Sequence, residues 1–203
     1  MLPISELASL LPTLLVQPFS GILYRAVTRK ALVGDPPYPS VRPLFDLGPA
    51  QKGARFTPLG GMRSVYLAAD PETAIAEVNQ AYAKLRLQNP PVMATIPACM
   101  IYSATVVLDT ILDVADPAVQ ATLETSEAEL CDPTWRVYQS QGGIPLTQMF
   151  GQAVFDCGSI QAIRYPSALL PGHMCYVVFT ERLTRSAFIQ VDDPDGYLKE
   201  QLP

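Results

Sequence analysis

Twenty prolines are spread over the 203 residues of the chain, and they limit where strands and helices can lie. Proline fixes the backbone angle φ and cannot donate a hydrogen bond to a β-ladder. The proline clusters at 36–39 and 90–91, with single prolines between them, therefore predict long rigid loops. Strands and helices are expected in the segments that these loops separate.

Those segments carry short strand patterns alternating with helix patterns. Apolar residues with a period of two, or β-branched runs, predict strands over 21–27, 64–69, 101–108, 160–165, 175–180 and 187–191. A period of 3.6 and capping signals predict helices over 5–15, 71–87, 117–130 and 146–156. The pairs Asp70-Pro71 and Asp116-Pro117 begin two of these helices, because Asp caps free N–H groups and Pro is tolerated in the first turn.

The spacing of these elements predicts an α+β fold. The strands are short and irregularly spaced, and no strand leads into a G-x-G-x-x-G loop, so a Rossmann fold is excluded. We expect a strongly bent or split, mostly antiparallel sheet with helices packed around it. The length suits one domain over 1–203, with an N-terminal helical extension at 1–20, a core at 21–191 and a loosely held polar tail at 192–203.

Composition excludes several classes of function. The net charge is −5 and no basic run occurs, which argues against direct nucleic-acid binding. Residues 2–19 are apolar but are interrupted by Glu6 and three prolines, so neither a signal peptide nor a membrane span is predicted. Four cysteines without a Cys-x-x-Cys pair and the single His173 predict no metal site and no histidine-dependent hydrolase. We expect free thiols and a cytoplasmic protein.

Three side chains of different chemistry follow one another on consecutive elements. Arg55 ends a long loop, Tyr66 lies in a strand, and Glu77 lies in the next helix. A guanidinium can hold a diphosphate, an aromatic ring can stack on a heterocycle, and a carboxylate can face a developing positive charge. Glu77 borders the apolar stripe that includes Ile75, a position that also permits an ordinary solvated glutamate. Arg25 is unusual in mid-strand, although a solvent-facing edge arginine is the alternative.

A resemblance to a known family rests on an ordered set of motifs. These are Leu23-Tyr24-Arg25-Ala26, Gly53-Ala54-Arg55-Phe56-Thr57-Pro58, Tyr66-Leu67-Ala68, Ala74-Ile75-Ala76-Glu77, Ile163-Arg164-Tyr165-Pro166-Ser167 and Val177-Val178-Phe179. Together they resemble the RES-domain family, which is named for its Arg, Glu and Ser. Phe56 and Thr57 depart from the tryptophan and asparagine that usually follow the motif arginine.

The resemblance implies a fold, a substrate and site residues. It implies an ADP-ribosyltransferase-like fold that binds NAD⁺ as its substrate and cleaves the nicotinamide–ribose bond, as in toxins of bacterial toxin–antitoxin pairs. It assigns Arg25 and Arg55 to the pocket, Tyr66 to its aromatic wall, Glu77 to the catalytic carboxylate and Ser167 to a further polar contact. The implied partner is an Xre-type antitoxin, with the N-terminal segment and the loop 36–49 as candidate contact surfaces.

Two alternatives to destruction of free NAD⁺ by hydrolysis or phosphorolysis stay open. A mono-ADP-ribosyltransferase toxin would use the same pocket but transfer ADP-ribose to a host metabolic protein. A non-enzymatic binding module would use Arg25, Arg55 and Glu77 as a structural ion-pair network. A homodimer is a further expectation, because apolar surface favours self-association.

Overall fold

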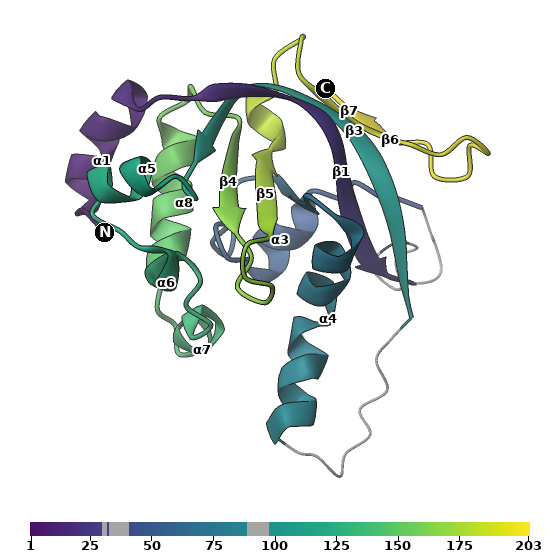
Figure 1. Cartoon of the computed structure of the whole chain (residues 1–203), viewed down its shortest axis with the longest axis horizontal. Coiled ribbons are helices and arrows are strands. Elements are labelled where there is room, and N and C mark those ends of the chain that lie inside the picture. Colours follow the sequence, from purple (N-terminus) through teal and green to yellow (C-terminus); the bar gives the residue numbers. More distant parts are fainter. Residues whose placement is uncertain (30–31, 33–40, 89–97) are drawn as a thin grey trace.

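The chain folds into a mixed α+β structure, as the sequence predicts (Figure 1). The computed structural model describes residues 1–29, 32, 41–88 and 98–203. Over residues 81–88 it describes the main chain but not the side chains. The proline clusters at 36–39 and 90–91 lie outside these residues. The described strands are β1 (Gln17–Thr28), β2 (Ser64–Ala68), β3 (Cys99–Asp113), β4 (Ala162–Pro166), β5 (Met174–Phe179), β6 (Phe188–Val191) and β7 (Gln201–Leu202). The helices are α1 (Ile4–Leu10), α3 (Leu47–Lys52), α4 (Pro71–Gln88), α5 (Pro117–Thr122), α6 (Glu127–Leu130), α7 (Trp135–Ser140) and α8 (Leu146–Asp156), with 3₁₀ turns η1 (Leu11–Thr13) and η2 (Thr180–Arg182).

The strands form one sheet in the order β1-β2-β5-β4-β3-β6-β7, and β1 pairs with β3 as well. The long strands β1 and β3 run side by side and arch over the shorter β4 and β5 (Figure 1). β3 pairs with β1 along one edge from Cys99 to Ile111. Along its other edge β3 changes partner, because Ala104–Val107 pairs with β6 and Ile111–Asp113 pairs with β4. Within the described chain, β3–β4 is the one parallel pair, so the sheet is mostly antiparallel and bent, as expected.

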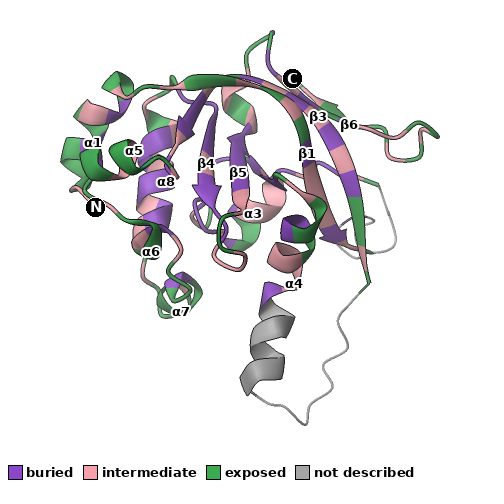
Figure 2. Cartoon of the chain, viewed as in Figure 1, coloured by how far each residue is buried: buried purple, intermediate pink, exposed green. Residues whose placement is uncertain are grey.

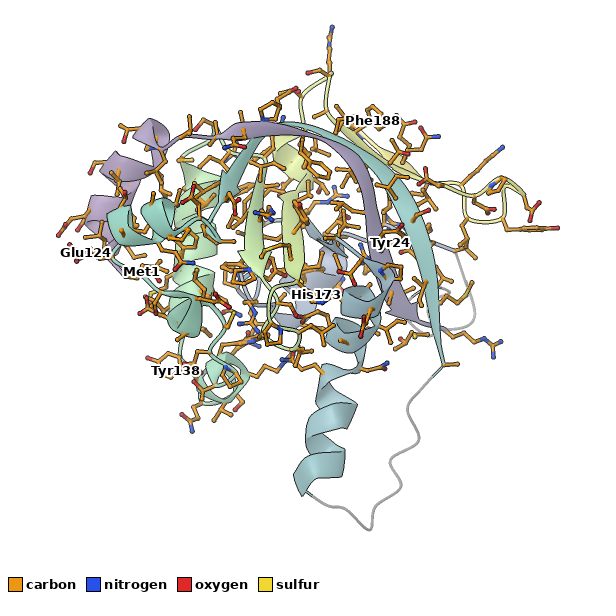
Figure 3. All side chains as sticks on the ribbon, in the orientation of Figure 1. Met1, Tyr24, Glu124, Tyr138, His173 and Phe188 are labelled. Carbon is orange, nitrogen blue, oxygen red and sulfur yellow. The ribbon has the colours of Figure 1, made fainter. Side chains whose placement is uncertain are left out.

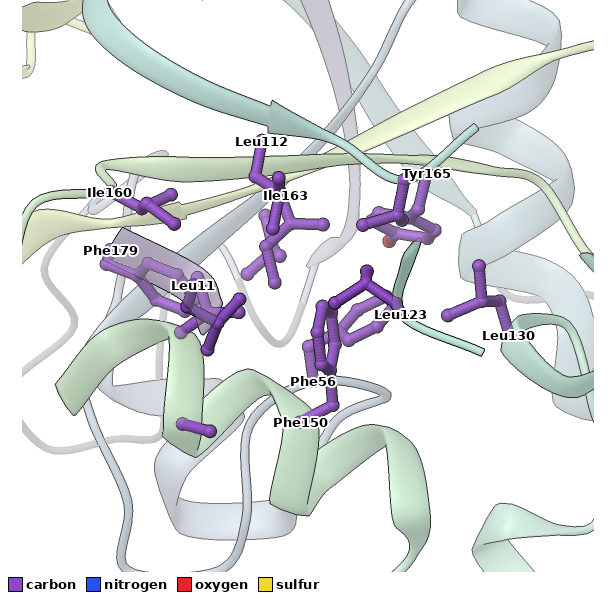
Figure 4. Packing of buried hydrophobic residues seen from close by; sticks show 14 of the residues in the cluster. Leu11, Phe56, Leu112, Leu123, Leu130, Phe150, Ile160, Ile163, Tyr165 and Phe179 are labelled. Carbon is purple, nitrogen blue, oxygen red and sulfur yellow. The ribbon is translucent and has the colours of Figure 1, made fainter. Parts of the chain in front are cut away.

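The central strands are buried on both faces (Figure 2). Side chains alternate across a strand, and β5 shows this directly. Val177 and Phe179 enter one apolar cluster, whereas Tyr176 and Val178 enter a second cluster on the other face. The first cluster lies between the sheet and α8, where Phe56, Phe150 and Tyr165 pack edge to face (Figure 4).

The N-terminal helix is docked on this same cluster. Leu7 of α1 and Leu11 of η1 are fully buried within it, and α1 lies against α8. The apolar character of residues 2–19 is thus largely accounted for by contacts inside the chain.

Helix α8 approaches the turn that carries Arg55 very closely. A Cβ atom added at Gly151 would lie 2.0 Å from the main-chain oxygen of Phe56. Only glycine allows this approach, and the turn is therefore seated directly on the helix.

The structure corrects three expectations. The helix predicted over 117–130 is two helices, α5 and α6, because Glu124 adopts a left-handed conformation with φ 49° and Ser126 caps a new helix. The polar tail is not loosely held, since β7 pairs with β6 and Leu202 packs on the second cluster. Ile75, which was expected in the buried stripe, is 36% exposed, and over the part of α4 whose side chains are described the buried residues are Thr73, Ala74 and Gln80.

An ion pair between the buried Asp46 and the exposed Arg63 ties the start of α3 to the start of β2. The carboxylate of Asp46, 1% exposed, accepts hydrogen bonds from Arg63 Nε at 2.8 Å and Nη2 at 3.0 Å, and from Thr180 Oγ1 at 2.7 Å. Burial alone would raise the pKa of Asp46, but these hydrogen bonds outweigh it and lower the pKa below its ordinary value. Asp46 therefore stabilises the fold fully above its unfolded pKa of about 3.9, and this contribution is lost as the pH falls through the lowered pKa.

Replacing Asp46 by asparagine removes this pH-dependent contribution. At pH 7 we expect the free energy of unfolding to fall by about 1.5–3 kcal/mol, the range for hydrogen bonds to charged groups. Below pH 4 the difference between variant and wild type should shrink, because the wild-type carboxyl becomes protonated. Urea unfolding between pH 3 and 7 measures both effects, with exposed Asp195→Asn as the control. A constant difference at every pH would contradict the assignment.

Candidate functional site

One cavity of about 290 Å³ brings together residues from four strands of the sheet, β1, β2, β4 and β5, and from three helices, α3, α4 and α7. Arg25 and Tyr24 enter from β1, Tyr66 from β2 and Glu77 from α4. Arg55 enters from the turn that rests on α8. The rest of the lining is Ala26, Val27, Thr28, Pro49, Ala54, Leu67, Ala68, Ala74, Val78, Gln80, Trp135, Arg136, Tyr165 and Cys175. Four of the five residues predicted from sequence thus line one cavity, and the fifth, Ser167, contacts it through Glu77.

Glu77 lies at the wall of the cavity between a hydroxyl and a thiol. Ser167 Oγ donates to Glu77 Oε1 at 2.8 Å, and Cys175 Sγ lies 3.8 Å from the same oxygen. Burial and the neighbouring Glu77 carboxylate raise the pKa of Cys175, which keeps its thiol protonated. Both neighbours therefore present hydrogen to Oε1 of the carboxylate, and Glu77 also lines the cavity.

Ser167 is held in the connection between β4 and β5. Its Oγ accepts hydrogen bonds from the main-chain N–H groups of Leu169 at 3.2 Å and Leu170 at 3.3 Å. Its own N–H donates to His173 O at 2.8 Å. Because the two amides occupy the acceptor side of the hydroxyl, its proton points to Glu77. Ser167 therefore orients the carboxylate.

The two predicted arginines are partly engaged by main-chain carbonyls. Arg55, 6% exposed, donates from Nη1 to Leu130 O at 2.7 Å. Arg25 donates from Nη2 to Phe45 O at 3.2 Å, while its Nη1 is buried and has no acceptor among the described residues. A buried N–H without a partner is costly. The cavity is therefore lined by a guanidinium group, that of Arg25, whose Nη1 lacks an acceptor among the described residues.

The hydroxyl of Tyr66 holds the Arg55 turn in place. It accepts a hydrogen bond from the Phe56 N–H at 3.0 Å and lies 2.9 Å from Thr57 Oγ1. Burial raises the pKa of Tyr66 to about 12, so the group is a neutral phenol near neutral pH. Tyr66 is thus a wall of the cavity and a support for Arg55, and it is no general base under these conditions.

Replacing Tyr66 by phenylalanine should leave the Phe56 N–H buried without an acceptor. Phe56 is fully buried, so water cannot take over the role of the hydroxyl. We expect the free energy of unfolding to fall by about 1–3 kcal/mol. Urea unfolding measures this loss, and Tyr197→Phe, at a residue that is 83% exposed, is the control. Equal stability of the two variants would show that the hydroxyl does not hold the turn.

Comparison with known proteins identifies the family of the chain. The family model of the RES domain matches residues 22–197, a span that includes all five predicted site residues. The chain belongs to the RES-domain family. A chain of the crystal structure of the M. tuberculosis MbcT–MbcA toxin–antitoxin complex has a similar fold, with a TM-score of 0.63 and 17% identity over 92% of this chain and 89% of that chain. A search of curated proteins finds no match.

The RES domain also has cavity-lining residues that the motifs do not reveal. These are Trp135 and Arg136 of α7 and Cys175 of β5, which lie in the lining together with the motif residue Tyr165. Helix α7 was not predicted, although Asp132-Pro133 repeats the Asp-Pro signal that marks two other helix starts. That repeated signal could have located α7, but nothing in the local sequence indicates that the helix faces Glu77.

His173 connects the two elements that carry Ser167 and Glu77. Its Nδ1 lies 2.9 Å from Asp70 Oδ2 and 2.9 Å from Thr73 Oγ1, while Asp70 Oδ1 accepts from the Thr73 N–H at 2.8 Å. In the RES domain His173 joins the β4–β5 connection to the first turn of α4, and Figure 3 shows it near the upper end of that helix.

Metal-binding clusters and membrane-spanning helices are both absent from the described chain. No three or more His, Cys, Asp or Glu side chains in it are grouped as they would be to hold a metal ion, and its four cysteines are free. None of its helices has the length and hydropathy needed to span a bilayer.

Proposed function

We propose that this RES domain binds NAD⁺ and cleaves its nicotinamide–ribose bond, and that it is the toxin of a toxin–antitoxin pair. The observation that carries the proposal is the convergence of Arg25, Arg55, Tyr66 and Glu77 on one cavity, with Glu77 oriented by Ser167. Family membership supports it, as does the likeness of the fold to a chain from a toxin–antitoxin complex. The proposal includes an ADP-ribosyltransferase-like fold, a cytoplasmic site of action and an Xre-type antitoxin.

The chemistry follows from the contacts of Glu77. Departure of nicotinamide leaves positive charge at C1′ of the ribose, so groups that stabilise this charge lower the barrier. Glu77 lines the cavity, so its carboxylate can accept from a ribose hydroxyl or face C1′ directly. The unsatisfied Nη1 of Arg25 would find its acceptor in an oxygen of the substrate.

The acceptor of the ADP-ribosyl group is water or phosphate in this proposal. Purified protein incubated with NAD⁺, with and without inorganic phosphate, is expected to release nicotinamide. Mass spectrometry then distinguishes ADP-ribose, the product of hydrolysis, from its 1″-phosphorylated form. Loss of NAD⁺ only when bacterial lysate is added, with a gain of ADP-ribose mass on one protein, would favour the transferase. No NAD⁺ loss under either condition would overturn the catalytic proposal.

A further inference from the structure

The cavity is positively charged in a protein that is acidic overall. Its charged lining consists of the guanidinium groups of Arg25, Arg55 and Arg136 and the single carboxylate of Glu77. This is a net of two positive charges, whereas the chain as a whole carries −5. Such a local excess of guanidinium favours a dianionic group such as a diphosphate over an uncharged nucleoside.

The three arginines differ in how free they are to bind that anion. Arg55 is buried and bonded to Leu130 O, and Arg25 is bonded to Phe45 O. Arg136 is exposed at the rim of the cavity, and among the described residues no carboxylate or carbonyl holds its guanidinium. Arg136 is therefore the arginine with its full hydrogen-bonding fork available.

Trp135 orients the free guanidinium. The Cζ atom of Arg136 lies 4.3 Å from the centre of the Trp135 ring, and Trp135 itself is 6% exposed. Stacking on a buried ring fixes the plane of the guanidinium and lowers the entropy lost when it binds a ligand. Desolvation and repulsion from Arg55 lower the pKa of Arg136, which indicates that the two charges face the same space. An anion placed there would relieve that repulsion.

We propose that Arg136, stacked on Trp135, is the residue that binds the diphosphate of the substrate at the rim of the cavity. Arg25 and Arg55 then lie deeper, toward the ribose and Glu77. This inference rests on the proposed function for the identity of the substrate, but the site itself requires only an adenine nucleotide with a diphosphate.

Trp135 is the only tryptophan of the chain, so its fluorescence reports ligands that reach Arg136. The experiment uses the Glu77→Gln protein, in which turnover is suppressed, and titrates it with NAD⁺, ADP and adenosine. Calorimetry provides a second measure of affinity that does not depend on the tryptophan. Adding Arg136→Gln is expected to weaken NAD⁺ and ADP binding by about 10- to 100-fold, the loss typical of a charge-assisted hydrogen-bonded pair. Binding of adenosine should not change.

Arg182→Gln is the matched control for the loss of a stacked arginine. Its Cζ lies 4.1 Å from the centre of the Phe155 ring, outside the cavity, so its replacement should leave all three affinities unchanged. The inference is overturned if ADP does not bind, or if Arg136→Gln binds ADP as tightly as its parent.

Kinetics separate this inference from the proposed function. In an otherwise wild-type protein, Arg136→Gln should raise KM for NAD⁺ with little change in kcat, because it removes binding that ground state and transition state share. Nicotinamide riboside, which lacks the diphosphate, should be turned over equally by both proteins. Arg136-dependent ADP binding without any NAD⁺ loss would refute the proposed function alone. NAD⁺ loss with an unchanged KM would refute the role of Arg136 alone.

Discussion

Replacing Glu77 by glutamine is expected to reduce the rate of NAD⁺ loss by about 100- to 1000-fold, the usual effect of removing one preorganised electrostatic partner of a transition state. The amide has the size of the carboxylate, and its carbonyl can still accept the hydrogen bond from Ser167 Oγ. What the variant loses is the negative charge that would face C1′. The midpoint of thermal unfolding should therefore stay close to that of the wild type while kcat falls.

Glu72→Gln is the matched control for this experiment. Glu72 lies in the first turn of the same helix and is exposed, and it does not line the cavity. Its replacement should change neither kcat nor the midpoint. The rival hypothesis of a structural ion-pair network makes the opposite prediction for Glu77→Gln, namely a loss of stability with no NAD⁺ turnover in either protein. Activity and unfolding measured on the same samples decide between the two.

Local elements were predictable because their signals are local. Pro71–Gln88 begins at an Asp-Pro pair, and Leu146–Asp156 has an apolar period of 3.6 ahead of a glycine, so both helices were located closely. The prediction of one helix over 117–130 was wrong because a single residue, Glu124, has φ 49°. The periodicity of apolar residues does not reveal a break at one residue. The exposure of Ile75 was missed because the residues that cover α4 come from distant strands.

The site was predictable as a set of residues but not as a geometry. Arg25, Arg55, Tyr66 and Glu77 were chosen by chemistry and motif, and the fold places them around one cavity. The hydrogen bond from Ser167 that orients Glu77 joins residues 90 positions apart in the sequence. The acceptors of Arg25 and Arg55 are main-chain carbonyls, which every residue type has, so the sequence does not mark them. Such contacts depend on which distant segments the fold brings together, and no local sequence pattern indicates this.

The Arg55 turn gives the second large expected effect, because it is seated on a glycine of α8. An alanine Cβ at Gly151 would lie 2.0 Å from Phe56 O and 2.8 Å from Phe56 C, and both of these are main-chain atoms that cannot rotate away. Helix or turn must shift. The better helix propensity of alanine, about 1 kcal/mol, opposes this but is smaller than the cost of overpacking against a rigid main chain, about 3 kcal/mol or more.

We therefore expect Gly151→Ala to lower the free energy of unfolding by at least about 2 kcal/mol in urea. The shift should also reach the site, because Arg55 precedes Phe56 and the Phe56 N–H is bonded to Tyr66, so kcat should fall even where the protein is still folded. Gly48→Ala in α3 is the matched control, since its Cβ would meet the Phe45 ring at an ordinary 3.4 Å and should be neutral or stabilising. If Gly151→Ala behaved like Gly48→Ala, α8 would not be the surface on which the Arg55 turn rests. The position of Arg55 would then have to be held by Tyr66 and Leu130 O alone.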